Sequence, residues 1–283
     1  MSASSARWSD LRLRLLSAAV LIPVAAFCIW RGGAVYDALI LLAMFGLAWE
    51  GETLIRQPLK TWRGCLLLAW PVIAGLAALK GEWSAAFWMI WPTLIFGFPA
   101  SVPVVVSIVG GLSLLWLRHL PLGMASVLFV ISVVIASDSF AYLTGRIFGG
   151  PKLAPSISPG KTRSGAIGGL VGSALAGGLV AWLTVPGTQL GGLICGAVLS
   201  VFSQSGDLLE SAAKRRLGVK DSGRLIPGHG GLLDRFDGLL AAAPAAALLS
   251  LAVAAHPFWS ILPADLTGGS AHSPILQGSS SHD

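Results

Sequence analysis

Charge is scarce in this chain of 283 residues, because only 11% of the residues are Asp, Glu, Lys or Arg while 54% are hydrophobic. Soluble domains carry about 25% charged residues, so this scarcity argues against an ordinary soluble protein. It also argues against nucleic-acid binding, since the basic residues lie in short loops between apolar runs and not along one soluble face. The mean hydropathy of +0.77 instead predicts an integral membrane protein.

Cysteine is rare as well, with only three residues in the whole chain. Cys28, Cys65 and Cys195 each lie in or beside an apolar run, and no two of them have the spacing of a metal-binding or redox pair. This excludes a disulfide framework and a cysteine zinc site. We expect all three to be small buried hydrophobic residues.

Long apolar runs are abundant, and a membrane-spanning helix needs about 20 such residues. The runs predict an all-α, polytopic membrane helix bundle with about nine transmembrane helices. The pair between Trp83 and Leu117 is the least regular, since Gly97-Phe98-Pro99 interrupts it, and a re-entrant hairpin is the alternative there. The expected spans are Leu13–Trp30, Ala34–Trp49, Cys65–Leu79, Trp83–Phe98, Val102–Leu117, Leu122–Tyr142, Ala166–Val185, Leu190–Phe202 and Leu239–Trp259.

The placement of the basic residues predicts the orientation of the bundle. Arg7, Arg12 and Arg14 precede the first span and place the N-terminus in the cytoplasm by the positive-inside rule. No clear cleavage site follows that span, so we interpret it as uncleaved. Counting spans then puts the loops of residues 146–163 and 207–237 on the cytoplasmic side. We expect three regions: N-terminal transmembrane helices (1–136), a C-terminal transmembrane catalytic region (137–264) and a polar, disordered tail (265–283).

One stretch, residues 203–238, concentrates charge in an otherwise apolar chain. Asp207 and Glu210 are three residues apart, as are Asp234 and Asp237, so each pair shares a face in a helix. Asp207 ends one expected span and Asp234 begins the next, where a helix N-terminus favours negative charge. Carboxylate oxygens at two adjoining helix ends indicate a site for one or two Mg²⁺ ions. Solvated carboxylates that cap the two helices are the alternative.

Basic residues lie between these two carboxylate pairs. Lys214, Arg215, Lys220 and Arg224 are placed to neutralise phosphate oxygens. The Lys-Arg-Arg run is also typical of a topology anchor that touches anionic lipid, so this reading stays open for part of it. His229 lies in a Pro-Gly-His-Gly-Gly turn, and we expect it to contact or orient a substrate. A structural histidine is the alternative.

A second polar segment follows the sixth expected span. Asp138, Tyr142 and Arg146 share one helical face, and an acid at membrane depth is a functional candidate by default. The Ser-Pro-Gly-Lys-Thr piece after them is not a P-loop, because Pro155 stands where that motif requires glycine. We expect phosphate contacts here, with positive-inside anchoring of the basic residues as the alternative. The residues concerned are Lys152, Ser158, Lys161 and Thr162.

Together these motifs resemble the phosphatidate cytidylyltransferases, also called CDP-diacylglycerol synthases. The family pattern is Ser-x-apolar-Lys-Arg, four residues, Lys-Asp, a small residue, and then His-Gly-Gly-x-x-Asp-Arg-x-Asp. It is matched by Ser211, Lys214, Arg215, Lys220, Asp221, Gly223, His229, Gly230, Gly231, Asp234, Arg235 and Asp237. The resemblance covers residues 137–244 and includes the upstream pieces DSxAYxxGR and KLAPxxSPGKT. Ala213 and Arg163 depart from the residues usual at their positions.

The resemblance implies a metal-dependent reaction of CTP with phosphatidate that gives CDP-diacylglycerol and pyrophosphate. It implies that Asp207, Asp234 and Asp237 bind the metal. Catalytic roles are expected for Asp207, Lys214, Arg215, Lys220, Asp221, His229, Asp234 and Asp237. Substrate contacts are expected from Asp138, Tyr142, Arg146, Lys152, Ser158, Lys161, Thr162, Ser211, Arg224, Gly230, Gly231 and Arg235.

A homodimer in the inner (plasma) membrane of a bacterium is likewise an expectation from the resemblance.

Two other classes of protein share some of these features. A CDP-alcohol phosphotransferase also uses membrane aspartates and metal, but its Asp-Gly and Ala-Arg pattern is missing here. A transporter would place such charges near the bilayer midplane and on paired broken helices, whereas here they cluster toward one side.

Overall fold

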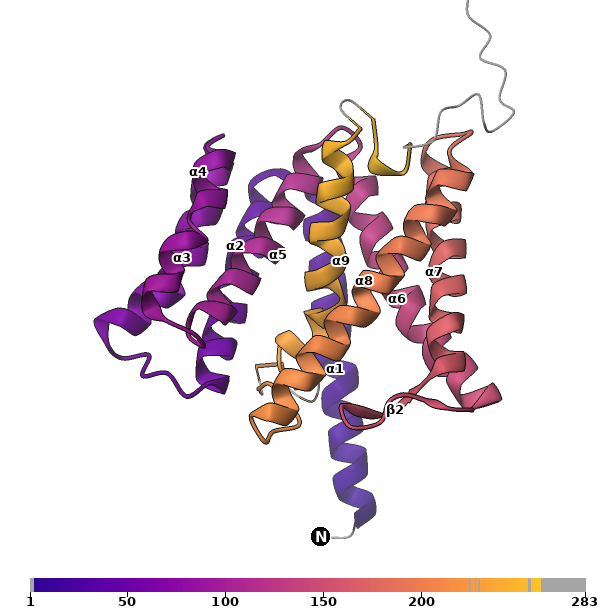
Figure 1. The fold of residues 1–283 in the computed structure, drawn as a ribbon, viewed down its shortest axis with the longest axis horizontal. Coiled ribbons are helices and arrows are strands. Elements are labelled where there is room, and N and C mark those ends of the chain that lie inside the picture. The colour runs from indigo at the N-terminus through magenta and orange to yellow at the C-terminus, as the bar shows by residue number, and fades with distance from the viewer. Residues whose placement is uncertain (1–2, 224, 227, 229, 254–255, 261–283) are drawn as a thin grey trace, which may run out of the picture.

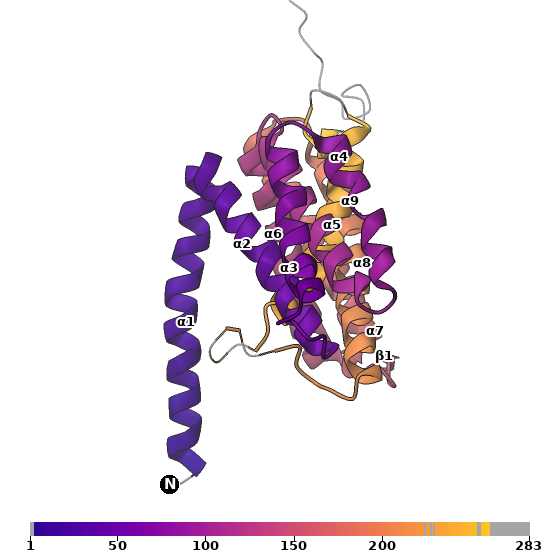
Figure 2. The same cartoon turned by 90° about the vertical axis from the view of Figure 1, so that its left-hand side faces the viewer.

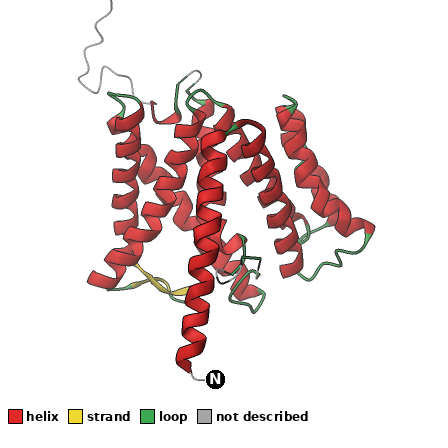
Figure 3. Ribbon diagram, turned by 180° about the vertical axis from the view of Figure 1, so that it is seen from behind, coloured by secondary structure: helices red, strands yellow, loops and turns green. Residues whose placement is uncertain are grey.

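The computed structural model describes residues 3–223, 225–226, 228, 230–253 and 256–260. This part of the chain is almost entirely helical, which confirms the predicted all-α membrane fold (Figure 3). The elements in order are α1 (Ala3–Arg31), α2 (Gly33–Leu54), α3 (Trp62–Leu79), α4 (Trp83–Trp88), η1 (Trp91–Phe96), α5 (Ser101–His119), α6 (Gly123–Phe148), β1 (Lys152–Ala154), β2 (Ser158–Thr162), α7 (Arg163–Thr184), α8 (Gln189–Arg216), α9 (Leu233–Leu251) and η2 (Phe258–Ser260).

Among the described residues, seven helices are long and apolar enough to cross a membrane, namely α1, α2, α3, α5, α6, α7 and α8. Helix α9 has 19 residues, the same length as α5, but its first turns carry three charged residues, Asp234, Arg235 and Asp237. These helices run roughly side by side in one bundle (Figure 1). Two of them extend well past the apolar runs that predicted them, since α2 includes Glu50 and Glu52 and α8 continues to Arg216.

The expected span Trp83–Phe98 is not a continuous helix. It consists of the six-residue α4 followed by the six-residue 3₁₀ helix η1, which has a proline in its first turn. Trp83 meets Trp116 near the end of α5, with ring centroids 5.0 Å apart. At the other end, Pro103 in the first turn of α5 packs against Gly51 near the end of α2, from which the chain continues to the start of α3. This short segment therefore returns the chain along α3, so α3 and α5 run in the same direction.

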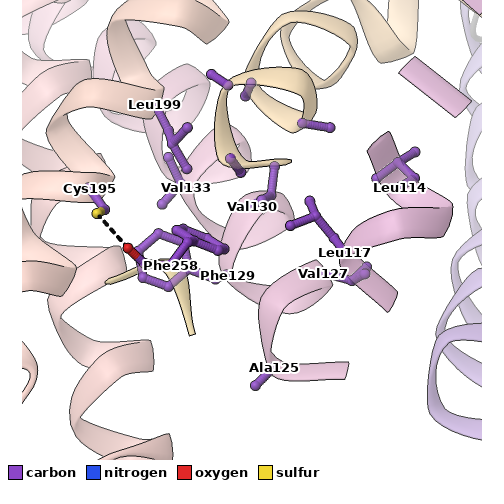
Figure 4. Close-up of a cluster of buried hydrophobic side chains, with 14 of the residues drawn as sticks. Leu114, Leu117, Ala125, Val127, Phe129, Val130, Val133, Cys195, Leu199 and Phe258 are labelled. Atoms are coloured by element: carbon purple, nitrogen blue, oxygen red, sulfur yellow. Dashed lines mark hydrogen bonds between the residues drawn. The ribbon is translucent and has the colours of Figure 1, made fainter. Parts of the chain in front are cut away.

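The core lies where α5, α6, α8 and α9 meet (Figure 4). The ring of Phe129 stacks on Trp259 with centroids 4.9 Å apart and meets Phe258 edge to face at 5.0 Å. Cys195 is buried against the backbone of Phe258, and Cys28 is buried too. Cys65 is exposed at the start of α3, so the expectation that all three cysteines are buried is wrong for this one.

Glycine lets α6, α7 and α8 approach closely, as small residues commonly do between membrane helices. A side chain at Gly196 of α8 would collide with the backbone at Ser173 of α7, and one at Gly177 of α7 would collide with the backbone of α8. The three helices consequently form a tight unit. The antiparallel strands β1 and β2 link α6 to α7 at one end of this unit, where a plain loop was expected.

Polar segments gather at that same end of the bundle. The N-terminus of α1, strand β2 and the segment between α8 and α9 all lie at the lower end in Figure 1. Helix α1 stands beside the bundle, as Figure 2 shows, and only 6% of its apolar stretch is buried inside the protein. A Cβ at Gly228 would lie 3.0 Å from the backbone nitrogen of Arg14, so α1 contacts the segment between α8 and α9.

Candidate active site

The candidate site is built from the last turns of α8 and the first turns of α9. Helix α8 continues without a break to Arg216. One helical face therefore carries three charged residues spaced three and four positions apart, namely Asp207, Glu210 and Lys214. The two helices approach closely, since a side chain at Gly206 would collide with the backbone oxygen of Asp237. The sequence thus places acidic side chains of both helices in one small volume.

Three carboxylates form an acidic cluster. Asp207, Glu210 and Asp237 each contribute an oxygen, and these three atoms all lie within 4.8 Å of one another. Asp138 of α6 is close enough to Asp207 and Asp237 to interact with them electrostatically. Carboxylate oxygens so grouped are the donors that a hard divalent cation such as Mg²⁺ prefers. The donor set therefore fits the metal that the sequence predicts, with Glu210 present in addition to the predicted ligands.

Two lysines form ion pairs with carboxylates of the site. Lys214 Nζ lies 2.6 Å from Asp234 Oδ1 and 2.7 Å from Glu210 Oε2, and the three side chains are only 13–15% exposed. Lys161, on strand β2, forms an ion pair with Asp207. The hairpin between α6 and α7 thus brings a cation to the cluster on α8 and α9. Two positive charges lie where phosphate oxygens of a substrate could replace the carboxylates as partners.

Asp234 is held by more than Lys214. Its carboxylate accepts hydrogen bonds from the backbone N–H of Ser222, 3.0 Å from Oδ2, and from that of Gly231, also 3.0 Å from Oδ2. Asp234 lies in the first turn of α9, where the helix dipole favours a negative charge. Its predicted role as a metal ligand stays a prediction, because in this structure its oxygens face these three donors.

Glu50 is part of this arrangement, although it was not among the residues predicted for the site. It lies in α2, it is only 3% exposed, and its carboxylate accepts three hydrogen bonds. The donors are Ser222 Oγ at 2.6 Å, Leu232 N–H at 2.8 Å and Leu233 N–H at 2.8 Å. The one available signal was an acid directly after the apolar run that ends at Trp49, since acids at membrane depth are costly and commonly functional.

Several other predicted residues have local partners. Ser211 Oγ donates to Asp207 Oδ1 at 3.4 Å, and Arg215 Nε donates to the carbonyl of Ile157 at 3.4 Å, which links α8 to the hairpin. The side chain of Thr162 caps α7 by accepting from Gly165 N–H at 3.1 Å. The carbonyl of Gly230 accepts from Ile226 N–H at 3.0 Å. Ser158 lies opposite Ala154 in the hairpin, and Lys152, Lys220, Asp221 and Arg235 are exposed.

The predicted face of α6 divides in two. Asp138 interacts with the acidic cluster as described, but Tyr142 is 66% exposed and its hydroxyl accepts a hydrogen bond from Arg146 at 2.7 Å. The structure therefore pairs Tyr142 and Arg146 with each other at the surface of the bundle. Their role in substrate binding stays a prediction. His229 and Arg224 lie outside the described residues.

Comparison with known proteins gives a consistent picture. A model of the cytidylyltransferase family matches residues 12–253. The phosphatidate cytidylyltransferase of Brucella abortus (strain 2308) is 39% identical over 256 residues, which cover 83% of this chain and 91% of the relative. The enzyme of that name from Haemophilus influenzae is 34% identical over 278 residues, covering 83% of this chain and 96% of the relative. One from Staphylococcus saprophyticus is 44% identical over 131 residues, which cover 43% of this chain and 47% of the relative.

Proposed function

The chain belongs to the cytidylyltransferase family, and from this we propose that it is a phosphatidate cytidylyltransferase, which converts CTP and phosphatidate to CDP-diacylglycerol and pyrophosphate. The observation that carries the proposal is the half-buried cluster of carboxylates and lysines between α8, α9 and the β1–β2 hairpin. It combines oxygen ligands for a cation with ammonium groups for phosphate, at one end of a membrane bundle where a lipid headgroup lies within reach.

The reaction joins two polyanions. A phosphate oxygen of phosphatidate attacks the α-phosphorus of CTP, a new P–O bond forms, and the bond to pyrophosphate breaks. Most of the catalysis in such transfers comes from positioning and from neutralising charge. A dedicated general base is not required, because the phosphate of phosphatidate is already ionised at neutral pH. The site must therefore supply positive charge at fixed positions. Its lysines carry such charge themselves, and its carboxylates would supply it through a bound cation.

Each group in the cluster has a role in this proposal. Asp207, Glu210 and Asp237 would hold Mg²⁺, and Asp234 would be a further ligand, as the sequence predicts. Bound Mg²⁺ screens the negative charge of the phosphates and polarises their oxygens. Lys161 and Lys214 exchange their carboxylate partners for phosphate oxygens of the substrates when these enter. Arg215, which lies against the hairpin, adds charge at the edge of the site.

We also propose that this end of the bundle faces the cytoplasm in a bacterial inner membrane, where CTP is available. The basic residues near the N-terminus and those of the hairpin support this orientation. Glu50 bears on the proposed division at residue 136, because it belongs to the N-terminal region yet contacts Ser222 and Leu232. The catalytic region 137–264 therefore depends on α2. The homodimer stays a prediction, and the tail 265–283 lies outside the described residues.

The test is transfer of label from CTP into lipid. Purified protein in detergent receives phosphatidate, CTP labelled in the cytidine, and Mg²⁺, in parallel with Asp234→Asn and with Glu82→Gln. Glu82 is an exposed acid between α3 and α4, at the end away from the site, so it serves as the control. We expect label in lipid for the wild type and the control, and at least about a hundredfold less for Asp234→Asn, as for loss of a group that acts in the transition state.

Other results would revise the proposal. Transfer that persists in Asp234→Asn would remove Asp234 from the machinery but keep the reaction. Transfer from CTP to a different phosphorylated lipid and not to phosphatidate would make the chain another lipid-phosphate cytidylyltransferase. Folded protein that transfers label from no nucleotide would overturn the proposal and favour a transporter.

A further inference from the structure

Three hydrogen-bond donors that come from two separate pieces of chain converge on the carboxylate of Glu50. We infer that Glu50 is a positioning residue of the active site, which holds Ser222 and the start of α9 so that the backbone around Asp234 can in turn hold the Asp234 carboxylate. The inference rests on the proposed function, and it gives a catalytic purpose to a helix that lies outside the motifs discussed above.

The start of α9 explains why a carboxylate is needed here. Leu232 is the residue that precedes the first turn of α9, and its side chain makes no capping hydrogen bond. The first N–H groups of a helix have no partner within the helix, so they require an acceptor from elsewhere. Glu50 supplies that acceptor to both Leu232 and Leu233, and its negative charge also suits the positive end of the helix dipole.

The connection from Glu50 to Asp234 passes through residues that touch both. Ser222 donates its hydroxyl to Glu50 Oε1 at 2.6 Å and its backbone N–H to Asp234 Oδ2 at 3.0 Å. Gly231 donates its N–H to Asp234, and a side chain at Gly231 would collide with Ser222 Oγ and Glu50 Oε1. Gly223 is packed against Glu50 in the same way. A shift of the Glu50 carboxylate therefore moves two of the groups that fix Asp234.

Glu52 provides a matched control on the same helix. It is fully buried, with 0% exposure, and neither of its carboxylate oxygens has a hydrogen-bond partner among the described residues. Glu50 and Glu52 are thus two buried acids in one turn of α2 that differ in whether they contact the site. Replacing each by glutamine makes the same chemical change in the same helix, so a general disturbance of α2 would affect both variants.

The experiment measures kcat/KM for CTP and the Mg²⁺ concentration that gives half-maximal activity for Glu50→Gln, Ser222→Ala, the double variant and Glu52→Gln. For Glu50→Gln we expect kcat/KM to fall about tenfold or more and the half-activating Mg²⁺ concentration to rise, because hydrogen bonds to a charged acceptor are the stronger ones. Ser222→Ala should give a smaller change of the same kind. The double variant should be no worse than Glu50→Gln, since both act through one connection. Glu52→Gln should resemble the wild type.

A second readout separates positioning from folding and from the proposed reaction. Thermal unfolding in detergent is followed with and without Mg²⁺, and we expect the Mg²⁺-induced rise in midpoint to be smaller in Glu50→Gln than in the wild type or Glu52→Gln. The inference is overturned if Glu50→Gln keeps the wild-type Mg²⁺ dependence in both measurements, or if Glu52→Gln shows an equal loss. If the wild type transfers no label, the proposed function fails, and the thermal measurement alone decides the role of Glu50.

Discussion

Replacing Asp237 by asparagine should stabilise the protein when metal is removed and abolish the stabilisation that metal provides. The side chain of Asp237 lies with those of Asp207 and Glu210 in the acidic cluster, where like charges repel unless a cation is bound. Asparagine keeps the shape of the side chain and can still accept the hydrogen bond that Gly238 N–H donates to Oδ1 at 2.7 Å. Only the charge is lost.

The size of the effect follows from the separations. Two unit charges 4.8 Å apart, the distance within which one oxygen of each carboxylate lies from the others, repel by about 3.5 kcal/mol at an effective dielectric constant of about 20. Lys161 on Asp207 and Lys214 on Glu210 offset much of this repulsion. We therefore expect Asp237→Asn to gain about 1–2 kcal/mol in metal-free buffer, after allowance for the lysines and for partial exposure of the site. In the wild type, Mg²⁺ at about a hundred times its Kd should add about 2.7 kcal/mol.

The assay is thermal unfolding in detergent, with chelator or with Mg²⁺, for the wild type and Asp237→Asn. In chelator the midpoint of the variant should lie above that of the wild type. In Mg²⁺ the order should reverse, because only the wild type gains from the ion, and label transfer should be lost in the variant. A variant less stable than the wild type in chelator would refute the reasoning, since the charge of Asp237 would then be a structural requirement. A variant that keeps the full Mg²⁺ shift would exclude Asp237 as a ligand.

Two further substitutions separate structural from catalytic roles in the hairpin. Thr162→Ala removes the cap of α7 and should lower the free energy of unfolding by about 1 kcal/mol with KM for CTP unchanged, whereas Thr162→Ser should restore stability. A raised KM in Thr162→Ala with unchanged stability would make Thr162 a substrate contact instead. Lys161→Met should raise KM for CTP or phosphatidate about tenfold or more, because a charged partner of phosphate is lost, and Lys161→Arg should bring KM part of the way back to the wild-type value. Unchanged KM values in Lys161→Met would leave Lys161 only as a counter-charge to Asp207.

Local patterns in the sequence were enough to predict the membrane bundle and the meeting of α8 with α9. Helical spacing placed Asp207 and Glu210 on one face, and charge at the two helix ends predicted that the carboxylates of α8 and α9 would approach each other. The helical spacing depends only on residues near each other in the chain, and the two helix ends meet because α8 and α9 are consecutive helices. The irregular segment after Trp83 was harder, because its length and apolar character fit a span while its prolines limit the helix to short pieces.

The part of the site that the sequence did not reveal depends on contacts between distant segments. Nothing near Glu50 in the sequence indicates that its carboxylate accepts a hydrogen bond from the backbone N–H of Leu232. That N–H group needs an acceptor only because α9 starts beside α2. The pairing of Lys161 with Asp207 likewise depends on the β1–β2 hairpin folding back over α8. Tyr142 and Arg146 show the reverse case, since the helical face they share with Asp138 was identified correctly but its far end points to the surface.

The hydrogen bonds of Glu50 also constrain how the protein is made. Its partners Ser222, Leu232 and Leu233 follow it by 172, 182 and 183 residues. At about 5–20 residues per second, a ribosome needs roughly 10–40 s to synthesise that interval. During this time α2 enters the bilayer with an unsatisfied acid at its end, and the first partner arrives only when α8 is complete. Nascent chains released before α9 should therefore have an α2 that lacks these three hydrogen bonds.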